Sequence, residues 1–204
     1  GGLQRFGDRY CCMDKIVMWL KIAVSCLPAM LIGLPLNDWL DKHFYNPTVV
    51  ALMLLLYGAG FLFVERYNRS RKPRVNSIAS LRWSDALLIG VFQVLALIPG
   101  TSRSGATILG GILIGTSREV AAEYTFFLAV PVMFGASLLK IVRFGTISGT
   151  ELGVLLVGMA VAFGVSILAI RFLMGYIRKH DFTAFGWYRI GLGLLVLLYF
   201  YVIR

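Results

Sequence analysis

The sequence predicts an all-α, polytopic membrane protein with about five spanning helices and one re-entrant, broken helix hairpin. Hydrophobic residues make up 58% of the 204 residues, and the mean hydropathy of +0.79 lies well above that of a soluble domain. At least five runs approach the roughly 20 apolar residues that a spanning helix needs. Two further apolar segments are each too short to cross a bilayer, and the polar, glycine-containing turn between them predicts the hairpin.

The charge pattern supports a membrane location. The chain carries 20 Lys and Arg residues against 10 Asp and Glu residues, a net charge of +10. On a soluble chain this excess would suggest nucleic acid, but here the basic residues cluster in connectors between apolar runs, as in cytoplasmic loops that face anionic lipid. We therefore expect the bilayer, and no nucleic acid, as a partner. The three cysteines form neither a CxxC metal knuckle nor a disulfide framework.

The N-terminal third is predicted to hold two spans. A polar, basic segment over residues 1–15 precedes a first span from about Ile16 to Leu36. Asn37 to Asn46 is predicted to be a short, nearly neutral loop. Pro47 then opens a second span, which ends at Val64, because the missing N–H of proline is tolerated in the first turn of a helix.

A basic loop follows from Glu65 to Arg82. It contains six basic residues against one acidic residue, which places it in the cytoplasm by the positive-inside rule. A nuclear-localisation or nucleic-acid function for this run is disfavoured because membrane spans flank it. The six basic residues are Arg66, Arg69, Arg71, Lys72, Arg74 and Arg82.

The predicted hairpin covers residues 84–115. Its first half runs from Ser84 to Ile98, contains Gln93, and stops at Pro99-Gly100. Its second half runs from Ala106 to Gly115. Neither half spans the membrane alone. Because lipid cannot satisfy the bare backbone of a turn, this turn must be packed in protein or line a wet cavity.

Three full-length spans complete the chain, and their connectors test the hairpin. The connector over residues 140–151 is close to neutral, whereas the connector over residues 171–189 is basic. A hairpin that enters and returns puts the neutral connector outside and the basic one inside, as the positive-inside rule requires. A full crossing would reverse both. The predicted spans run from Val120 to Val142, from Leu152 to Leu173 and from Phe185 to Ile203.

The turn from Pro99 to Thr107 has the chemistry of an oxyanion site. Arg103 offers five donors in a planar fork that fits phosphate oxygens, and an arginine at membrane depth marks a functional site by default. The free N–H groups and the positive dipole end of the second half-helix point to the same place. Residues that add hydroxyl donors or allow close backbone approach are Ser102, Ser104, Thr107, Gly100 and Gly105.

Structural interpretations exist for the same residues. Arg103 could pair with a carboxylate, for which Glu123 is the obvious candidate, and serine and glycine are ordinary packing residues between membrane helices. The concentration of one arginine, three hydroxyls and several glycines or prolines within nine residues favours anion binding. For Glu123 itself, one turn into its helix, a structural ion pair is a better explanation than catalysis.

The motif resembles that of a known family. Residues 90–108, GVFQVLALIPGTSRSGATI, followed by Ser117-Arg118 and by EYTFFLAVP at residues 123–131, are similar to the second signature of the bacterial undecaprenyl-diphosphate phosphatases of the bacitracin-resistance type. The PGxSRSGxT pattern is specific, and the similarity extends to Tyr188-Arg189 in the last span. The resemblance implies an integral enzyme of the bacterial inner membrane that hydrolyses undecaprenyl diphosphate and so recycles the lipid carrier of cell-wall precursors.

The resemblance also implies roles for individual residues. Arg103 matches the family's phosphate-binding arginine and, with Ser102, is predicted to be catalytic. Substrate phosphate is predicted to contact Ser104, Gly105, Thr107 and Gln93. The implied partner is a polyprenyl diphosphate lipid within the bilayer, and a homodimer is compatible with the pattern.

This sequence departs from the family pattern in its other half. The family has inverted repeats, and its other hairpin carries a glutamate-rich motif, a serine and a histidine that bind a divalent cation and supply the nucleophile or base. No Ser-Ser-x-Gly-His run occurs in the 204 residues, and His43 and His180 lie in predicted loops. The resemblance therefore implies Mg²⁺ or Ca²⁺ as a cofactor, with ligands in an absent N-terminal part. We expect this single domain, residues 1–204, to bind the lipid phosphate without hydrolysing it.

Two other functional classes fit part of the pattern. A membrane transporter or lipid translocase could hold an anion at the same broken helix without chemistry. A lipid phosphatase of the soluble type would need a histidine nucleophile, which has no counterpart near Ser102-Arg103. Release of inorganic phosphate from a polyprenyl diphosphate distinguishes the enzyme from the transporter.

Overall fold

The computed structural model describes residues 2–144 and 149–203, and every regular element in these ranges is a helix. This confirms the predicted all-α class. The elements in order are α1 (Gly2–Phe44), α2 (Pro47–Asn68), α3 (Trp83–Val94), the 3₁₀ turn η1 (Leu95–Leu97), α4 (Arg103–Ile114), α5 (Arg118–Phe144), α6 (Gly149–Ile177), α7 (Thr183–Leu198) and the π-helical end η2 (Tyr199–Ile203).

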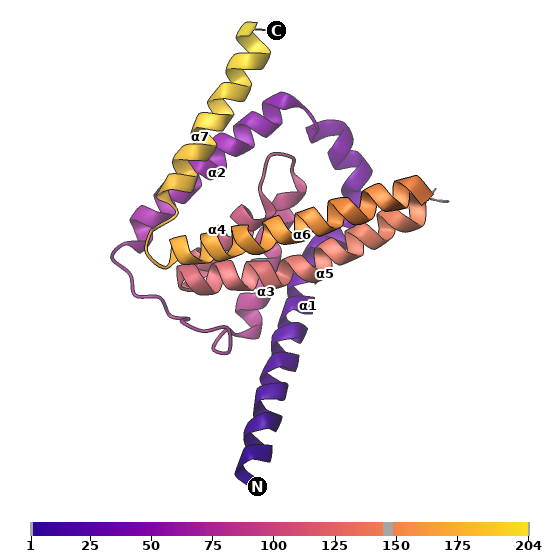
Figure 1. Cartoon of the computed structure of the whole chain (residues 1–204). Coiled ribbons are helices and arrows are strands. Elements are labelled where there is room, and N and C mark those ends of the chain that lie inside the picture. The colour runs from indigo at the N-terminus through magenta and orange to yellow at the C-terminus, as the bar shows by residue number, and fades with distance from the viewer. Residues whose placement is uncertain (1, 145–148, 204) are drawn as a thin grey trace.

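Five of the described helices are long and apolar enough to cross a membrane, as the sequence predicts. Most of their surface is exposed in the isolated chain, and among the described residues of α6 only Ile177, at its end, is buried. Figure 1 shows α5 and α6 side by side, and α7 against α2. Because apolar side chains that face outward are at home in lipid, this surface is consistent with a polytopic protein. The candidate spans are Lys15–Gly33, Pro47–Asn68, Arg118–Val142, Gly149–Ile177 and Thr183–Val202.

The sequence prediction of a loop over residues 37–46 is wrong for most of that range. Helix α1 continues to Phe44, and the break is confined to two residues before α2. Asn46 ends the break because its side-chain Oδ1 accepts a hydrogen bond from Val49 N at 2.9 Å, and Pro47 follows at the first helical position. A polar composition is compatible with either a loop or an exposed helix, so it does not locate the end of α1.

The hairpin has the predicted re-entrant geometry. Helices α3 and α4 are 12 residues each, too short to span, and a Cβ on Gly110 would collide with the Phe92 ring, so the two helices pack against each other. The segment before α3 is joined to the segment after α4 by backbone hydrogen bonds, from Arg74 N to Gly115 O at 2.8 Å and from Ser117 N to Val75 O at 2.9 Å. The chain therefore enters and leaves this hairpin at the same end.

One boundary within the hairpin differs from the prediction. Helix α4 begins at Arg103, three residues before the predicted start at Ala106. The cause is Ser102, whose extended backbone and side-chain oxygen make it the N-cap. Residues 105–112 of α4 are all buried, so this short helix is the most enclosed element of the described structure.

Close backbone contacts hold the surrounding helices around α4. Helix α1 meets α3 where a Cβ on Gly90 would strike the backbone of Ser25. The buried Ser25 hydroxyl donates to Ala86 O at 2.6 Å and lies 2.7 Å from the Tyr124 hydroxyl of α5. Helices α1, α3 and α5 are thereby joined on one side of the hairpin, and α2 and α7 close the other.

Candidate anion-binding site

Ser102 is the N-cap residue of α4. Gly105 N donates to Ser102 Oγ at 3.1 Å, and Ala106 N donates to Ser102 O at 2.9 Å. The Ser104 hydroxyl lies 3.0 Å from Ser102 Oγ. Within the described residues, the backbone N–H groups of Arg103 and Ser104 have no acceptor. Two free donors and the positive end of the helix dipole therefore meet at this turn.

The backbone before the cap depends on a glycine. Gly100 has a φ of +88°, the left-handed region that side chains other than glycine rarely adopt. A Cβ at this position would lie 2.6 Å from the Cα and the carbonyl oxygen of Val50 in α2. The turn can therefore lie directly against α2, as a polar turn inside a membrane protein must.

Arg103 is half-buried and lacks a carboxylate partner. Its Nη1 atom is buried and has no hydrogen bond in the described structure. Cys26 of α1 lies close enough to interact electrostatically with the guanidinium. The expected structural alternative, an ion pair with Glu123, is not among the ion pairs of the described residues. A buried guanidinium nitrogen without a partner is expected to bind an anion.

The structure brings a second arginine to the same turn. Arg189 of α7 reaches Gly105, where a Cβ would lie 3.3 Å from Arg189 Nη2 and 3.3 Å from Ser102 Cβ. The Arg189 Nη1 atom is also buried without a hydrogen bond, and its Cζ lies 5.9 Å from the centre of the Phe61 ring. The sequence showed Tyr188-Arg189 within the last span, but it did not assign the arginine a role. An arginine six residues inside a spanning helix is the signal that could have found it.

Two further polar side chains near the turn lack partners. Gln93, in the last turn of α3, is 3% exposed, and both its amide atoms are unpaired. The buried Thr101 hydroxyl also has no hydrogen bond, and the Tyr57 hydroxyl of α2 lies next to it. Five of the six unpaired buried side-chain atoms in the described residues belong to Gln93, Thr101, Arg103 and Arg189. Such groups are normally bonded, so their concentration in this part of the fold indicates a binding site.

Thr107 is used differently from the other hydroxyls of the motif. It is 1% exposed, and its Oγ1 donates within α4 to Arg103 O at 3.0 Å and to Ser104 O at 3.2 Å. The Thr125 hydroxyl of α5 donates to it at 3.0 Å. Thr107 therefore connects α4 to α5. Its predicted contact with substrate phosphate stays a prediction, as do those of Ser104, Gly105 and Gln93.

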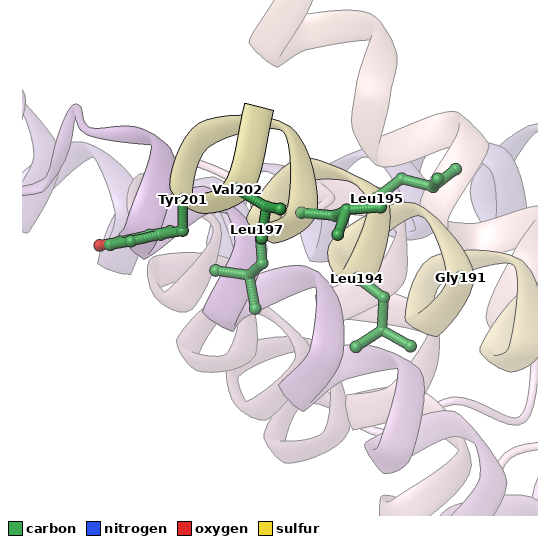
Figure 2. A pocket seen from close by; sticks show the side chains of 7 residues that line it. Gly191, Leu194, Leu195, Leu197, Tyr201 and Val202 are labelled. Atoms are coloured by element: carbon green, nitrogen blue, oxygen red, sulfur yellow. The ribbon is translucent and has the colours of Figure 1, made fainter. Parts of the chain in front are cut away.

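Two surface hollows lie elsewhere. A hollow of about 620 Å³ lies along α7 (Figure 2), where the leucine side chains from Leu194 to Leu198 make an apolar lining without a cation. A second, of about 420 Å³, lies between α5 and α6 and contains Glu119, Glu123 and Arg178. Their apolar walls suit lipid chains, and neither is lined by Arg103 or Arg189, so we assign the anion site to the α4 turn.

A metal centre cannot be built from the described side chains alone. Within residues 2–144 and 149–203, no three His, Cys, Asp or Glu side chains gather as a metal ion would require. Glu119 and Glu123 are four residues apart on an exposed face of α5, and Arg178 lies 3.8 Å from Glu119. These residues do not fit the implied divalent cation, so no chemical step is derived through one.

The fold and the site define the class: a multi-pass membrane protein with buried, unpaired arginine nitrogens at the turn of a re-entrant hairpin. The chain belongs to the bacitracin resistance protein BacA family, whose model matches residues 3–195. The undecaprenyl-diphosphatase of Acetivibrio thermocellus is 58% identical over 192 residues, or 94% of this chain and 71% of the relative. That of Desulfitobacterium hafniense is 57% identical over 189 residues, covering 92% and 68%. Undecaprenyl-diphosphatase 1 of Clostridium acetobutylicum is 54% identical over 199 residues, covering 97% and 73%. The resemblance seen in the motif is confirmed.

Proposed function

We propose that this protein hydrolyses undecaprenyl diphosphate to undecaprenyl phosphate and inorganic phosphate in the bacterial cell membrane. The observation that carries the proposal is the pair of arginines, Arg103 and Arg189, with unpaired buried nitrogens at the N-terminus of α4. Membership of the BacA family and the names of the relatives support the same activity. The cell-wall role follows because the monophosphate is the reusable form of the carrier.

Two arginines suit a diphosphate better than a single phosphate. One guanidinium can pair with the oxygens of each phosphate group in a planar, bidentate contact. Arg103 comes from the hairpin and Arg189 from the last helix, so the two groups approach the turn from different elements. The free N–H groups of Arg103 and Ser104 add donors to the phosphate oxygens between them.

The same groups would stabilise the developing charge of the reaction. Hydrolysis breaks the bond between the terminal phosphorus and the bridging oxygen, and water adds its hydroxyl to that phosphorus. The remaining proton of the water goes to the phosphate oxygens or to solvent, and the lipid leaves as the monophosphate. Negative charge grows on the bridging oxygen as the bond breaks. Preorganised donors in a water-poor site stabilise such charge without having to reorient. Arg103 is the residue that we place closest to this oxygen, with Ser102 beside it.

Two further properties are proposed, a metal cofactor and an oligomeric state. A divalent cation, Mg²⁺ or Ca²⁺, is proposed as cofactor from the resemblance alone, with ligands outside the residues of the α4 turn. A homodimer is likewise proposed only from the sequence. The lipid substrate and the bilayer are the partners that the spanning helices and the family support.

The test compares phosphate release with lipid movement. Membranes containing a full-length version of the protein receive undecaprenyl diphosphate, and inorganic phosphate is measured for the wild type, Arg189→Lys and Arg178→Lys. Arg178 is the matched control because it is an exposed arginine whose side chain forms an ion pair with Glu119, at 3.8 Å. We expect wild-type release with Arg178→Lys and a large loss with Arg189→Lys. Lipid transfer across vesicles without phosphate release would show the translocase instead and contradict the proposal.

A further inference from the structure

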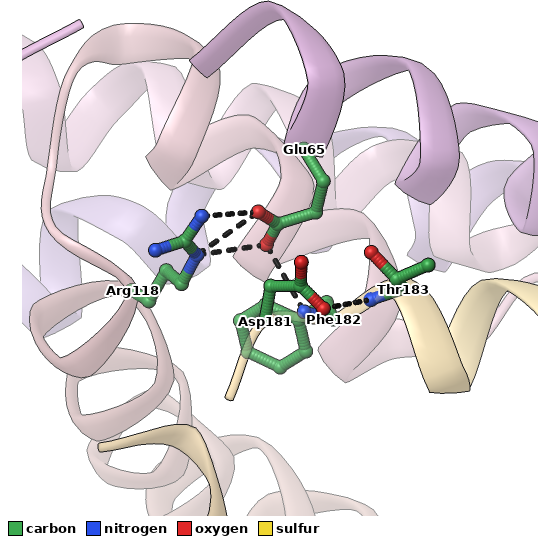
Figure 3. Close-up of polar contacts among 5 residues, drawn as sticks. All are labelled: Glu65, Arg118, Asp181, Phe182 and Thr183. Atoms are coloured by element: carbon green, nitrogen blue, oxygen red, sulfur yellow. Dashed lines mark hydrogen bonds and ion pairs between the residues drawn. The ribbon is translucent and has the colours of Figure 1, made fainter. Parts of the chain in front are cut away.

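A buried carboxylate joins three helix ends at one side of the fold (Figure 3). The Glu65 side chain, near the end of α2, is 4% exposed. It accepts hydrogen bonds from Arg118 Nε at 2.9 and 3.0 Å, and from Arg118 Nη2. It also accepts one from Phe182 N at 3.1 Å. Arg118 is the first residue of α5, and Phe182 is the N-cap residue of α7, so Glu65 connects α2 with both.

Glu65 supplies a hydrogen-bond acceptor at the start of α7, where the N-cap residue of α7 has no capping side chain. The N-cap residue Phe182 has no side-chain oxygen, and Asp181 Oδ1 accepts a hydrogen bond from Thr183 N at 3.2 Å. The Glu65 carboxylate supplies a second acceptor and a negative charge at the positive end of the helix dipole. The start of α7 is therefore fixed by a residue of another helix.

The contact between α2 and α7 is close along both helices. It is made by glycines: a Cβ on Gly186 would lie 3.0 Å from Gly58 O, and one on Gly193 would lie 3.1 Å from Ala51 O. Leucine side chains of α2 pack against the same glycines, with Leu62 Cδ2 at 3.0 Å from the Cβ position of Gly186 and Leu55 Cγ at 3.0 Å from that of Gly193. The start of α7 is held in addition by the buried hydrogen bond from Phe182 N to Glu65.

One arginine of the proposed site, Arg189, lies on a helix that Glu65 holds, and the other, Arg103, lies on α4, the helix that precedes α5. Arg189 follows Thr183 by six residues, about 9 Å along α7 at 1.5 Å per residue. Arg118 follows α4 after a three-residue connection that starts at the left-handed Gly115. A displacement at Glu65 would therefore move the Arg189 guanidinium relative to Gly105 and the Arg103 turn.

We propose that Glu65 is a positioning residue, which sets the separation of Arg189 and Arg103 by clamping the starts of α5 and α7. The inference rests on the proposed function, because it concerns the two arginines assigned to the diphosphate. It differs from a purely structural role in one respect. A structural ion pair stabilises the fold but leaves ligand affinity in the folded protein unchanged, whereas a positioning residue alters that affinity.

The experiment measures inorganic pyrophosphate binding and thermal stability on the detergent-solubilised full chain. Glu65→Gln keeps the shape and an acceptor for Phe182 N but removes the charge that pairs with Arg118. Glu119→Gln is the control, because it removes a neighbouring, exposed carboxylate of the same end. We expect Glu65→Gln to weaken pyrophosphate binding at least tenfold in protein that is still folded, and Glu119→Gln to bind as the wild type does.

The other outcomes separate the two proposals. Wild-type affinity in folded Glu65→Gln overturns the positioning role and leaves the anion site intact. A wild type that does not bind pyrophosphate overturns the anion site and, with it, this inference. If Glu65→Gln does not fold, Arg118→Lys gives the same comparison, since it keeps the buried charge pair but loses the double contact to the carboxylate. Unchanged affinity in Arg118→Lys then contradicts the clamp.

Discussion

Replacing Gly105 by alanine should separate stability from anion binding. Alanine is favoured over glycine in a helix by up to about 1 kcal/mol. The new Cβ would lie 3.3 Å from Arg189 Nη2 and 3.5 Å from Arg189 Cζ. Ordinary van der Waals contacts of a Cβ begin at 3.4 Å, so the first of these distances is too short. Ser102 Cβ, also 3.3 Å away, limits movement on the other side. The Arg189 guanidinium must therefore shift by a few tenths of an ångström, while the fold keeps or gains stability.

The expected loss follows from the hydrogen bonds that the guanidinium makes. A hydrogen bond to a charged group contributes about 1.5–3 kcal/mol, and a small displacement removes part of it. We expect Gly105→Ala to weaken pyrophosphate binding about fivefold, or ~1 kcal/mol, with an unchanged or higher Tm. Isothermal titration and thermal unfolding measure the two quantities. Gly60→Ala is the matched control, because its Cβ would meet only Leu109 Cδ1 at 3.6 Å. Wild-type affinity in Gly105→Ala would refute the placement of the anion beside Arg189.

Three further substitutions test other parts of the site. In a full-length version of the protein, Arg103→Lys should lower kcat/KM for the diphosphate about a hundredfold, roughly 3 kcal/mol, and an unchanged rate of phosphate release would make Arg103 structural. Gly100→Ala should lower the free energy of unfolding by more than about 1 kcal/mol, because of the φ of +88° and the contact with Val50; a wild-type Tm would contradict that turn geometry. Thr125→Val removes the hydrogen bond to Thr107 and should destabilise the protein by about 1 kcal/mol without changing pyrophosphate affinity. A loss of affinity would indicate that Thr107 contributes to anion binding.

The number and type of the helices could be predicted from sequence because the bilayer imposes a length and a composition on each span. The hairpin was also predictable, since charge asymmetry between connectors excludes a full crossing. The end of α1 was not, because a polar sequence such as that after Asn37 fits a helix as well as a loop. The start of α4 was missed by three residues because a serine cap is decided by local backbone geometry.

Arg103 could be predicted as a site residue, but Arg189 could not, for a physical reason. Arg103 stands inside a motif whose neighbours all point to the same chemistry. Arg189 stands alone among apolar residues near a basic connector, where an arginine commonly extends to the interface. Only the packing of α7 against α2 turns its guanidinium towards Gly105. The role of Glu65 could not be predicted either, because in the sequence it is the single acidic residue of a basic loop.

A bound anion accounts for features of this fold that are otherwise unfavourable. Two guanidinium groups of like charge approach one turn, and each keeps a buried nitrogen without a hydrogen bond. Desolvation of the two charges opposes this arrangement. The free N–H groups at the start of α4 add to the same imbalance. If the arginines served only packing, a carboxylate partner would stabilise the fold, as Glu65 does for Arg118. The absence of such a partner among the described residues around Arg103 and Arg189 is explained when the ligand brings the negative charge.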